Sequence, residues 1–145
     1  MIAIGSDHGG FALKQILIEY LGELNFECKD MGCYDENSVD YPDIAEKVCA
    51  EVVNENAKLG ILVCGTGIGM NICANKIKGI RAAQCSDTFS AKMTRRHNNS
   101  NVITLGGRTV GPELAKEIVR EFLTNEFEGE RHERRVNKII ALENK

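Results

Sequence analysis

The chain has 145 residues, of which 43% are apolar and 27% charged, and its net charge is −3. This length suits one domain that buries about two-thirds of the surface exposed by the unfolded chain, and the mild acidity excludes a general affinity for nucleic acid or anionic membranes. Because residues 1–5 are too short for a signal peptide and no apolar run approaches about 20 residues, we expect a cytoplasmic protein.

Short apolar segments alternate with amphipathic ones along the whole chain. Strands are predicted at residues 2–5, 26–29, 61–64, 80–85 and 101–105. Helices are predicted at 11–24, 42–56, from about 67 onward, and at 87–96, 112–127 and 131–142. This alternation indicates an α/β fold: a three-layer α/β/α sandwich with a five-stranded parallel, Rossmann-like sheet, forming a single domain over residues 1–145 that ends in a C-terminal helix.

Two of the predicted strands end in polar, glycine-rich corners. The first strand runs into Ser6-Asp7-His8-Gly9-Gly10, and the third ends at Cys64, which is followed by Gly65, Gly67 and Gly69. Glycines let backbone N–H groups crowd toward one point, and the positive end of the following helix adds its field. Such a corner binds an anion and favours the thiolate form of a nearby thiol, so Cys64 is a candidate reactive group. The alternative is that Cys64 is a small core residue.

The other cysteines and the histidines give no sign of a metal or a disulfide framework. The six cysteines form no C-x-x-C pair and lie mostly in predicted strands and helices, which indicates reduced thiols. Cys28, Cys49, Cys73 and Cys85 are expected in or near the core. Because the three histidines also lack ligand-type spacing, we expect no zinc site.

The polarity of the predicted strands divides the polar residues between two edges of the sheet. One edge receives the residues that follow strands: Asp7, His8, Cys64, Thr66 and Arg108, with Tyr41 if its loop folds back. The other edge receives the residues that follow helices: His97, Asn98, Arg131 and Arg135. Either the second group is unrelated to Cys64, or a second subunit brings it to the first subunit's site.

The second group also has a purely structural explanation. Residues 95–99 are typical of a helix C-terminus with a polar cap. Arg131 and Arg135 fit a solvated helix face beside an exposed Glu130–Arg134 pair.

The glycine corner at Cys64 matches no common phosphate-binding motif. A dinucleotide fingerprint needs G-x-G-x-x-G after the first strand, whereas here G-x-G-x-G follows the third, although Asp87 lies about where a ribose-binding acid would fall. A C-x5-R phosphatase loop would need arginine in place of Met70, and a P-loop would need Gly-Lys-Ser/Thr after the glycines. A non-catalytic anion- or nucleotide-binding module stays open as an alternative.

Several segments, in their joint order and spacing, resemble ribose-5-phosphate isomerases of type B, within the ribose/galactose isomerase family, over nearly the whole chain. They are Ser6-Asp7-His8-Gly9-Gly10-Phe11, Asp40-Tyr41-Pro42, Cys64-Gly65-Thr66-Gly67-Ile68-Gly69, Ala74-Asn75-Lys76, Gly79-Ile80-Arg81-Ala82, Arg96-His97-Asn98, Arg131-His132 and Arg135-Val136. The wider family includes isomerases of galactose 6-phosphate and allose 6-phosphate. Cys64 resembles the branch with a thiol base, because Met70-Asn71 lacks the carboxylate of the other branch.

The resemblance implies a metal-free, cofactor-free aldose–ketose isomerisation of ribose 5-phosphate to ribulose 5-phosphate through an enediolate, a step of the pentose phosphate pathway. Cys64 would move the proton between carbons 1 and 2, Thr66 would exchange protons with substrate hydroxyls, and His97, aided by Asp7, would open the furanose ring. The residues that would hold the phosphate are His8, Arg108, Arg131 and Arg135. The other implied substrate contacts are Tyr41, Gly65, Gly67, Ile68, Gly69, Met70, Asn71 and Asn98.

The resemblance also implies a homodimer, or a tetramer, whose active site lies between subunits. His97, Asn98, Arg131 and Arg135 would then come from the partner subunit. No role is implied for His132 or Arg134, and the preference among pentose and hexose phosphates stays open.

Overall fold

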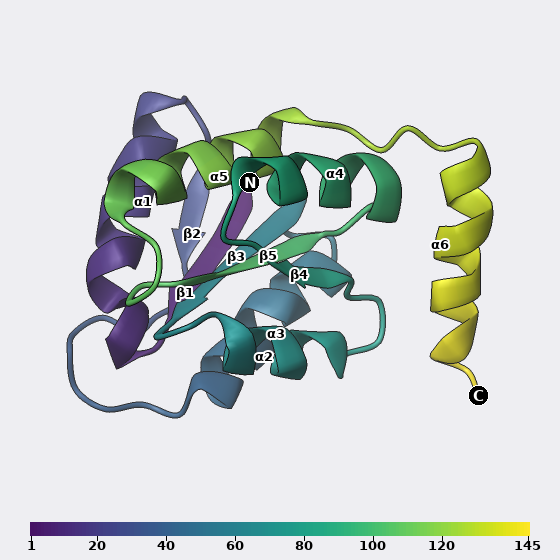
Figure 1. Ribbon diagram of the computed structural model, residues 1–145. Helices are drawn as coiled ribbons and strands as arrows, with labels where there is room; N and C mark the ends of the chain where they lie inside the picture. The colour runs from purple at the N-terminus through teal and green to yellow at the C-terminus, as the bar shows by residue number, and fades with distance from the viewer.

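Five parallel strands form the centre of the protein, in the order β2-β1-β3-β5-β4 (Figure 1). The computed structural model describes residues 1–145, and the strands are β1 Ile2–Ser6, β2 Cys28–Asp30, β3 Leu59–Cys64, β4 Ala82–Gln84 and β5 Val102–Gly106. Every pairing in the sheet is parallel, with Cys64 opposite Gly106 in the β3–β5 register. The predicted α/β fold with a five-stranded parallel sheet is therefore confirmed.

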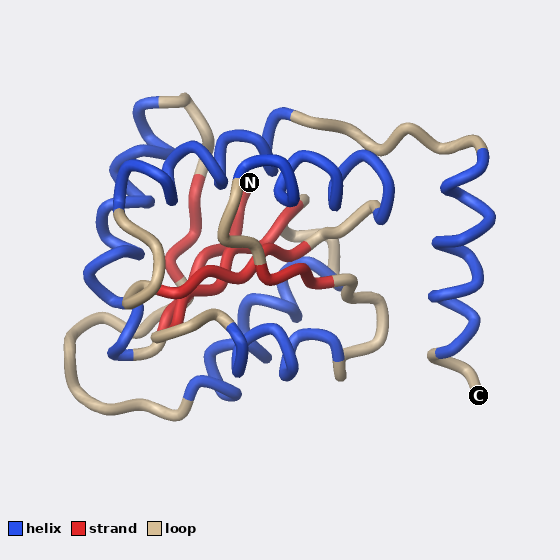
Figure 2. The backbone as a smooth tube through the Cα atoms, in the orientation of Figure 1, coloured by secondary structure: helices blue, strands red, loops and turns tan.

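Helices cover both faces of this sheet, as Figure 2 shows around the red strands. They are η1 His8–Gly10 (a 3-10 turn), α1 Phe11–Glu23, α2 Tyr41–Val53, α3 Ile68–Asn75, α4 Thr88–Asn98, α5 Pro112–Thr124 and α6 Arg131–Leu142. Apolar residues of α1, α4 and α5 form one core cluster with the sheet, and those of α2 and α3 form another. The sheet is thus the middle layer of three.

The alternation of side chains along β3 assigns its residues to the two core clusters. Ile61 and Val63 pack with the α1, α4 and α5 layer, whereas Leu62 and Cys64 pack with the α2 and α3 layer. All six residues of β3 are buried. This agrees with the sequence of the strand, in which apolar residues do not alternate with polar ones. The strand therefore delivers Cys64 to the carboxyl edge of the sheet, on the side of α3.

Several predicted boundaries differ from the structure. β2 spans Cys28–Asp30 rather than 26–29, β4 is confined to Ala82–Gln84, and α2 and α5 end at Val53 and Thr124, about three residues early. Strand ends are set by ladder partners on neighbouring strands, and β2 and β4 are edge strands with one partner each.

The isoleucine spacing that indicated α3 does not mark its core-facing side. Ile68 and Ile72 are 55% and 57% exposed, whereas Met70 and Ala74 are fully buried. The helix begins at the sheet edge and packs on β3 and β5 through the Met70–Ala74 stripe, so the two isoleucines lie on its open face. The helix was predicted correctly, but its apolar exposed face was not.

A long loop leads from β2 into α2, drawn in tan in Figure 2. A buried lysine on α1 anchors the start of this loop. Lys14 has no exposed surface, and its Nζ lies 2.7 Å from the Asp30 carboxylate and donates to the Cys33 carbonyl. Because a buried ammonium is unfavourable without partners, these contacts fix the start of the loop. The sequence pattern did not indicate this anchor, because Lys14 lies beside the apolar positions of an amphipathic helix.

The C-terminal helix α6 lies apart from the three layers, at the right margin of Figure 1. Only His132 and Val136 of this helix are buried, and Ile139, Ile140 and Leu142 are among the exposed large apolar residues. No helix combines the length and the apolar character that crossing a bilayer requires.

Candidate active site

Cys64 occupies a tightly held corner between β3 and α3. Cys64 is only 5% exposed. Its Sγ accepts a hydrogen bond from the Gly67 N–H at 3.1 Å. Gly67 has φ +81°, and a Cβ added there would lie 2.9 Å from the Leu105 backbone carbon, so only glycine fits. The Thr104 hydroxyl donates to the Gly67 carbonyl at 2.8 Å. The corner thus fixes the thiol against a backbone donor.

The same corner carries backbone donors that no protein group uses. The N–H groups of Gly65, Thr66, Gly69 and Met70 have no acceptor within the chain, whereas the Ile68 N–H donates to the Thr66 hydroxyl at 3.3 Å. Free N–H groups in the first turn of a helix are a ready anion site, because the helix dipole adds to their partial charge. The arrangement can therefore hold a negative oxygen within reach of a thiol.

The polar corner after β1 packs directly against this one. A Cβ on Gly9 would lie 3.3 Å from the Gly65 nitrogen, and one on Gly107 would lie 2.9 Å from the Gly9 carbonyl oxygen. Asp7 is nearly buried, and its carboxylate accepts the Gly10 N–H at 3.1 Å. The glycines allow the three corners after β1, β3 and β5 to meet at one point.

The rim of this point carries an aromatic ring and two cationic or polar side chains. The Tyr41 ring packs on Gly69, where a Cβ would collide with it, so the loop does fold back to the carboxyl edge. The Arg108 guanidinium lies 3.4 Å from the place of a Cβ on Gly65. His8 is exposed, and its Nδ1 accepts the Val39 N–H at 3.3 Å. The predicted residues of the first edge are thus together in the structure.

Asn71 lies on α3 beyond this corner. Its Oδ1 accepts from Asn75 at 3.2 Å, and its buried Nδ2 has no partner in the chain. An amide donor without an acceptor is available to a ligand.

Four of the other five cysteines have raised pKa values. Burial raises the pKa of Cys49 to about 12 and that of Cys28 and Cys85 to about 11, and it also raises the pKa of Cys73. All six thiols are free, and these four lie in or beside the core as expected. At neutral pH these four thiols are protonated and unreactive.

The structure does not bring the second predicted group to Cys64. His97 and Asn98 end α4, and Arg131 and Arg135 lie on α6, at the edge where the strands begin (Figure 1). Arg131 and Arg135 are both exposed, one turn apart on the helix. Within one chain these residues cannot serve the Cys64 corner.

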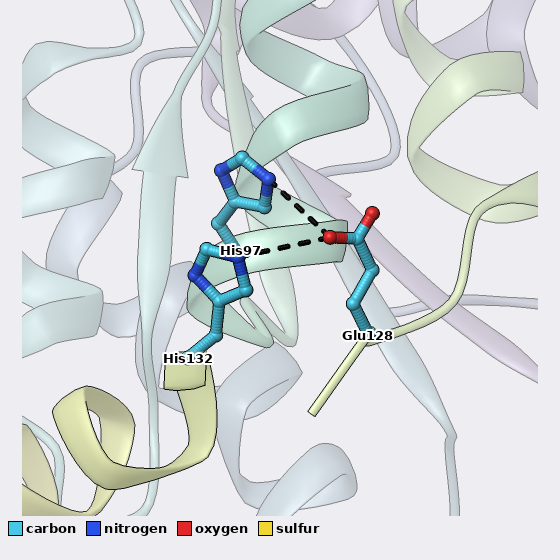
Figure 3. Close-up of side chains that lie close together, drawn as sticks. All are labelled: His97, Glu128 and His132. Carbon is cyan, nitrogen blue, oxygen red and sulfur yellow. Dashed lines mark ion pairs between the residues drawn. The ribbon is translucent and has the colours of Figure 1, made fainter. Parts of the chain in front are cut away.

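The second group has neighbours that sequence reasoning missed. The His97 ring stacks on the His132 ring with centroids 4.0 Å apart, and the Glu128 carboxylate faces both (Figure 3). The Glu130–Arg134 pair of the structural alternative does not form; the ion pair at this i, i+4 spacing joins Glu128 and His132. That spacing was a usable signal for the pair. His97, Glu128 and His132 are also the only three potential metal ligands of the chain that lie together, within 4.8 Å.

Comparisons with known proteins agree with one another. The family model described as Ribose/Galactose Isomerase matches residues 2–139. The chain is 46% identical to ribose-5-phosphate isomerase B of Escherichia coli, over 98% of this chain and 95% of that protein. It is 48% identical to D-erythrulose-4-phosphate isomerase of Pectobacterium atrosepticum, over 95% of this chain and 91% of that one. The structure of Clostridium thermocellum ribose-5-phosphate isomerase B superimposes with a TM-score of 0.97 at 46% identity, covering 99% and 97% of the two chains.

Proposed function

The chain belongs to the ribose/galactose isomerase family, and on that premise we propose that it interconverts ribose 5-phosphate and ribulose 5-phosphate with Cys64 as the base. It is an aldose–ketose isomerase of the kind to which its relatives belong. The observation that carries the assignment of Cys64 is its Sγ, held 3.1 Å from the Gly67 N–H beside unused backbone donors.

The isomerisation moves two protons, one between carbons 1 and 2 and one between their oxygens, and leaves the sugar phosphate otherwise unchanged. The Cys64 thiolate takes the proton from carbon 2 of the open-chain aldose, which gives an enediolate, and returns it to carbon 1, which gives the ketose. The free N–H groups of Gly65, Gly69 and Met70 stabilise the oxyanion. Thr66 moves the proton between the two hydroxyl oxygens, because its exposed hydroxyl lies at the same corner.

Ring opening comes before this step, because ribose 5-phosphate is mainly a furanose. His97 protonates the ring oxygen as the bond from carbon 1 to that oxygen breaks, and Asp7 accepts the proton of the carbon 1 hydroxyl. The aldehyde forms without net gain or loss of protons. An imidazole suits this role because its ordinary pKa lies close to neutral pH.

His97 and Cys64 can act on one substrate only if two subunits build the site. We therefore propose a homodimer, or a tetramer made of such dimers, in which the α4 end and α6 of one chain meet the Cys64 corner of its partner. The exposed Ile68 and Ile72 beside this corner, and Ile139 and Leu142 on α6, are apolar surfaces that such a contact would bury.

The phosphate and the substrate chain bind across the same interface. The side chains proposed to hold the phosphate are His8 and Arg108 of one subunit and Arg131 and Arg135 of the second, identical subunit. The proposed sugar contacts are Tyr41, Ile68, Asn71 and, across the interface, Asn98. Exposed guanidinium groups suit a phosphate dianion because they donate in pairs.

Two alternative functions can be tested together with the proposed one. The family name includes galactose, and one relative is named for a four-carbon sugar phosphate, so chain length of the sugar is the main alternative. A binding module without chemistry would use the corner but not the thiol.

The test is an assay with ribose, erythrulose, allose and galactose phosphates, in the presence of a chelator, for the wild type and Cys64→Ala. We expect ribose 5-phosphate to be converted fastest, and Cys64→Ala to lower turnover by at least about a thousandfold while substrate affinity changes by only a few fold. Cys49→Ala is the matched control for removal of a thiol. Near-normal turnover in Cys64→Ala would exclude the thiol base, and faster conversion of another sugar would reassign the substrate.

A further inference from the structure

Two histidine side chains, one from α4 and one from α6, converge on one carboxylate oxygen of Glu128 at the end of α4. The Glu128 Oε1 lies 3.5 Å from His97 Nε2 and 3.7 Å from His132 Nε2 (Figure 3). Glu128 is itself held by Arg96, whose Nε lies 2.9 Å from the other carboxylate oxygen and whose carbonyl accepts the Glu128 N–H. His132 is 7% exposed, and its Nε2 forms no hydrogen bond within the chain.

The environment of His132 disfavours its charged form. Burial, helped by the nearby His97 ring and the Arg131 and Arg135 guanidinium groups, lowers the pKa of His132, and only Glu128 opposes this. The two ring planes are 10° from parallel, with centroids 4.0 Å apart, so His132 supports the His97 ring by stacking on it.

We propose that Glu128 and His132 are positioning residues for His97, with the carboxylate fixing the proton on His97 Nε2 and the His132 ring holding the imidazole plane. His97 Nδ1 is then the atom that exchanges a proton with the sugar ring oxygen. The inference rests on the proposed function, since it assumes that His97 opens the furanose. An imidazole held by a carboxylate keeps one tautomer and one orientation, which is what a directed proton transfer needs.

The test separates ring opening from enediolate chemistry. One measurement is turnover of ribose 5-phosphate, which needs both steps. The other is exchange of the carbon 1 hydrogen of ribulose 5-phosphate with deuterium from the solvent, followed by NMR, which needs only the Cys64 step because this ketose cannot close to a furanose. We expect Glu128→Gln to lower the first rate by about tenfold or more and to leave the second within about twofold.

The control variants isolate the role of the carboxylate. Glu130→Gln makes the same charge change two residues along the chain, outside the cluster, and should leave both rates unchanged. His132→Phe keeps a stacking ring and should retain most of the ribose 5-phosphate turnover, whereas His132→Ala should lose it as Glu128→Gln does. Adding Glu128→Gln to His97→Asn should cost nothing further, because the carboxylate acts through the imidazole.

The possible results distinguish this inference from the proposed function. If Glu128→Gln turns over ribose 5-phosphate like the wild type, lowers both rates equally, or adds its full loss to that of His97→Asn, the positioning role is wrong. If Glu128→Gln does not fold, His132→Phe still tests the proposal. A folded His132→Phe that loses most of its ribose 5-phosphate turnover would contradict it. A wild type that does not convert ribose 5-phosphate would overturn the proposed function itself.

Discussion

Replacing Gly67 with alanine is expected to damage both the stability and the chemistry of the Cys64 corner. Gly67 has φ +81°, a conformation that costs an L-residue about 1–2 kcal/mol. The added Cβ would also lie 2.9 Å from the Leu105 backbone carbon, and relieving such a contact costs about 1–3 kcal/mol. Together the free energy of unfolding should fall by about 2–5 kcal/mol, which lowers Tm by about 5–15 °C.

The effect on turnover follows from the hydrogen bond that Gly67 donates. Moving the turn away from β5 moves the Gly67 N–H away from the Cys64 Sγ, which it now meets at 3.1 Å. A hydrogen bond to a charged group contributes about 1.5–3 kcal/mol, so kcat should fall roughly 10- to 150-fold. Substrate affinity should change less, because the rim residues His8, Tyr41 and Arg108 are untouched.

Two other glycines supply the controls. Gly79 also has a positive φ, +93°, but a Cβ there meets only Val53 Cγ2 at 3.5 Å, so Gly79→Ala should lower Tm without changing kcat. Gly22, in α1, has no atom within 4 Å of the added Cβ, and Gly22→Ala should stabilise the protein by about 0.5–1 kcal/mol. Thermal melts and steady-state assays of all three variants decide the matter. Wild-type Tm and kcat in Gly67→Ala would refute both the strain and the role of the Gly67 N–H.

Two further predictions concern the dimer and the buried thiols. The Cys64→Ala variant and the Arg131→Ala/Arg135→Ala double variant, mixed equally and refolded together, should recover about a quarter of wild-type activity. Half of the dimers are then mixed, and each mixed dimer has one intact site. Verified mixed dimers without activity would contradict a shared site. Burial raises the pKa of Cys49 from 9.0 to about 12 and that of Cys85 from 9.0 to about 11. Unfolding therefore releases protons from these thiols above about pH 9, and the free energy of unfolding should fall as pH rises from about 9 toward 11 for Cys85 and toward 12 for Cys49. Denaturant titrations at pH 8 and pH 10.5 measure this loss of stability, which should be smaller in Cys49→Ala than in the wild type. An equal loss in the two proteins would contradict a raised pKa for Cys49.

Local sequence patterns were enough to predict the succession of strands and helices along the chain and the position of the candidate active-site residue Cys64. Neighbours in sequence define the apolar run that ends at Cys64 and the glycines after it, so both can be recognised without tertiary contacts. Strand polarity alone predicted that Cys64 and Arg131 lie at opposite edges, because all strands of a parallel sheet point the same way. The fold class and the two-edge division of the residues followed from these local signals.

Contacts between distant residues decided the rest. The burial of Lys14 depends on Asp30 and Cys33, and the outward direction of Ile68 depends on which stripe of α3 meets the sheet. The stacking of His97 on His132 needs α4 and α6 to meet, and no pattern within either helix carries that information. Sequence periodicity describes each element alone, whereas burial and pairing are properties of the packed chain, so only the tertiary structure could place the Glu128 carboxylate beside both imidazole rings.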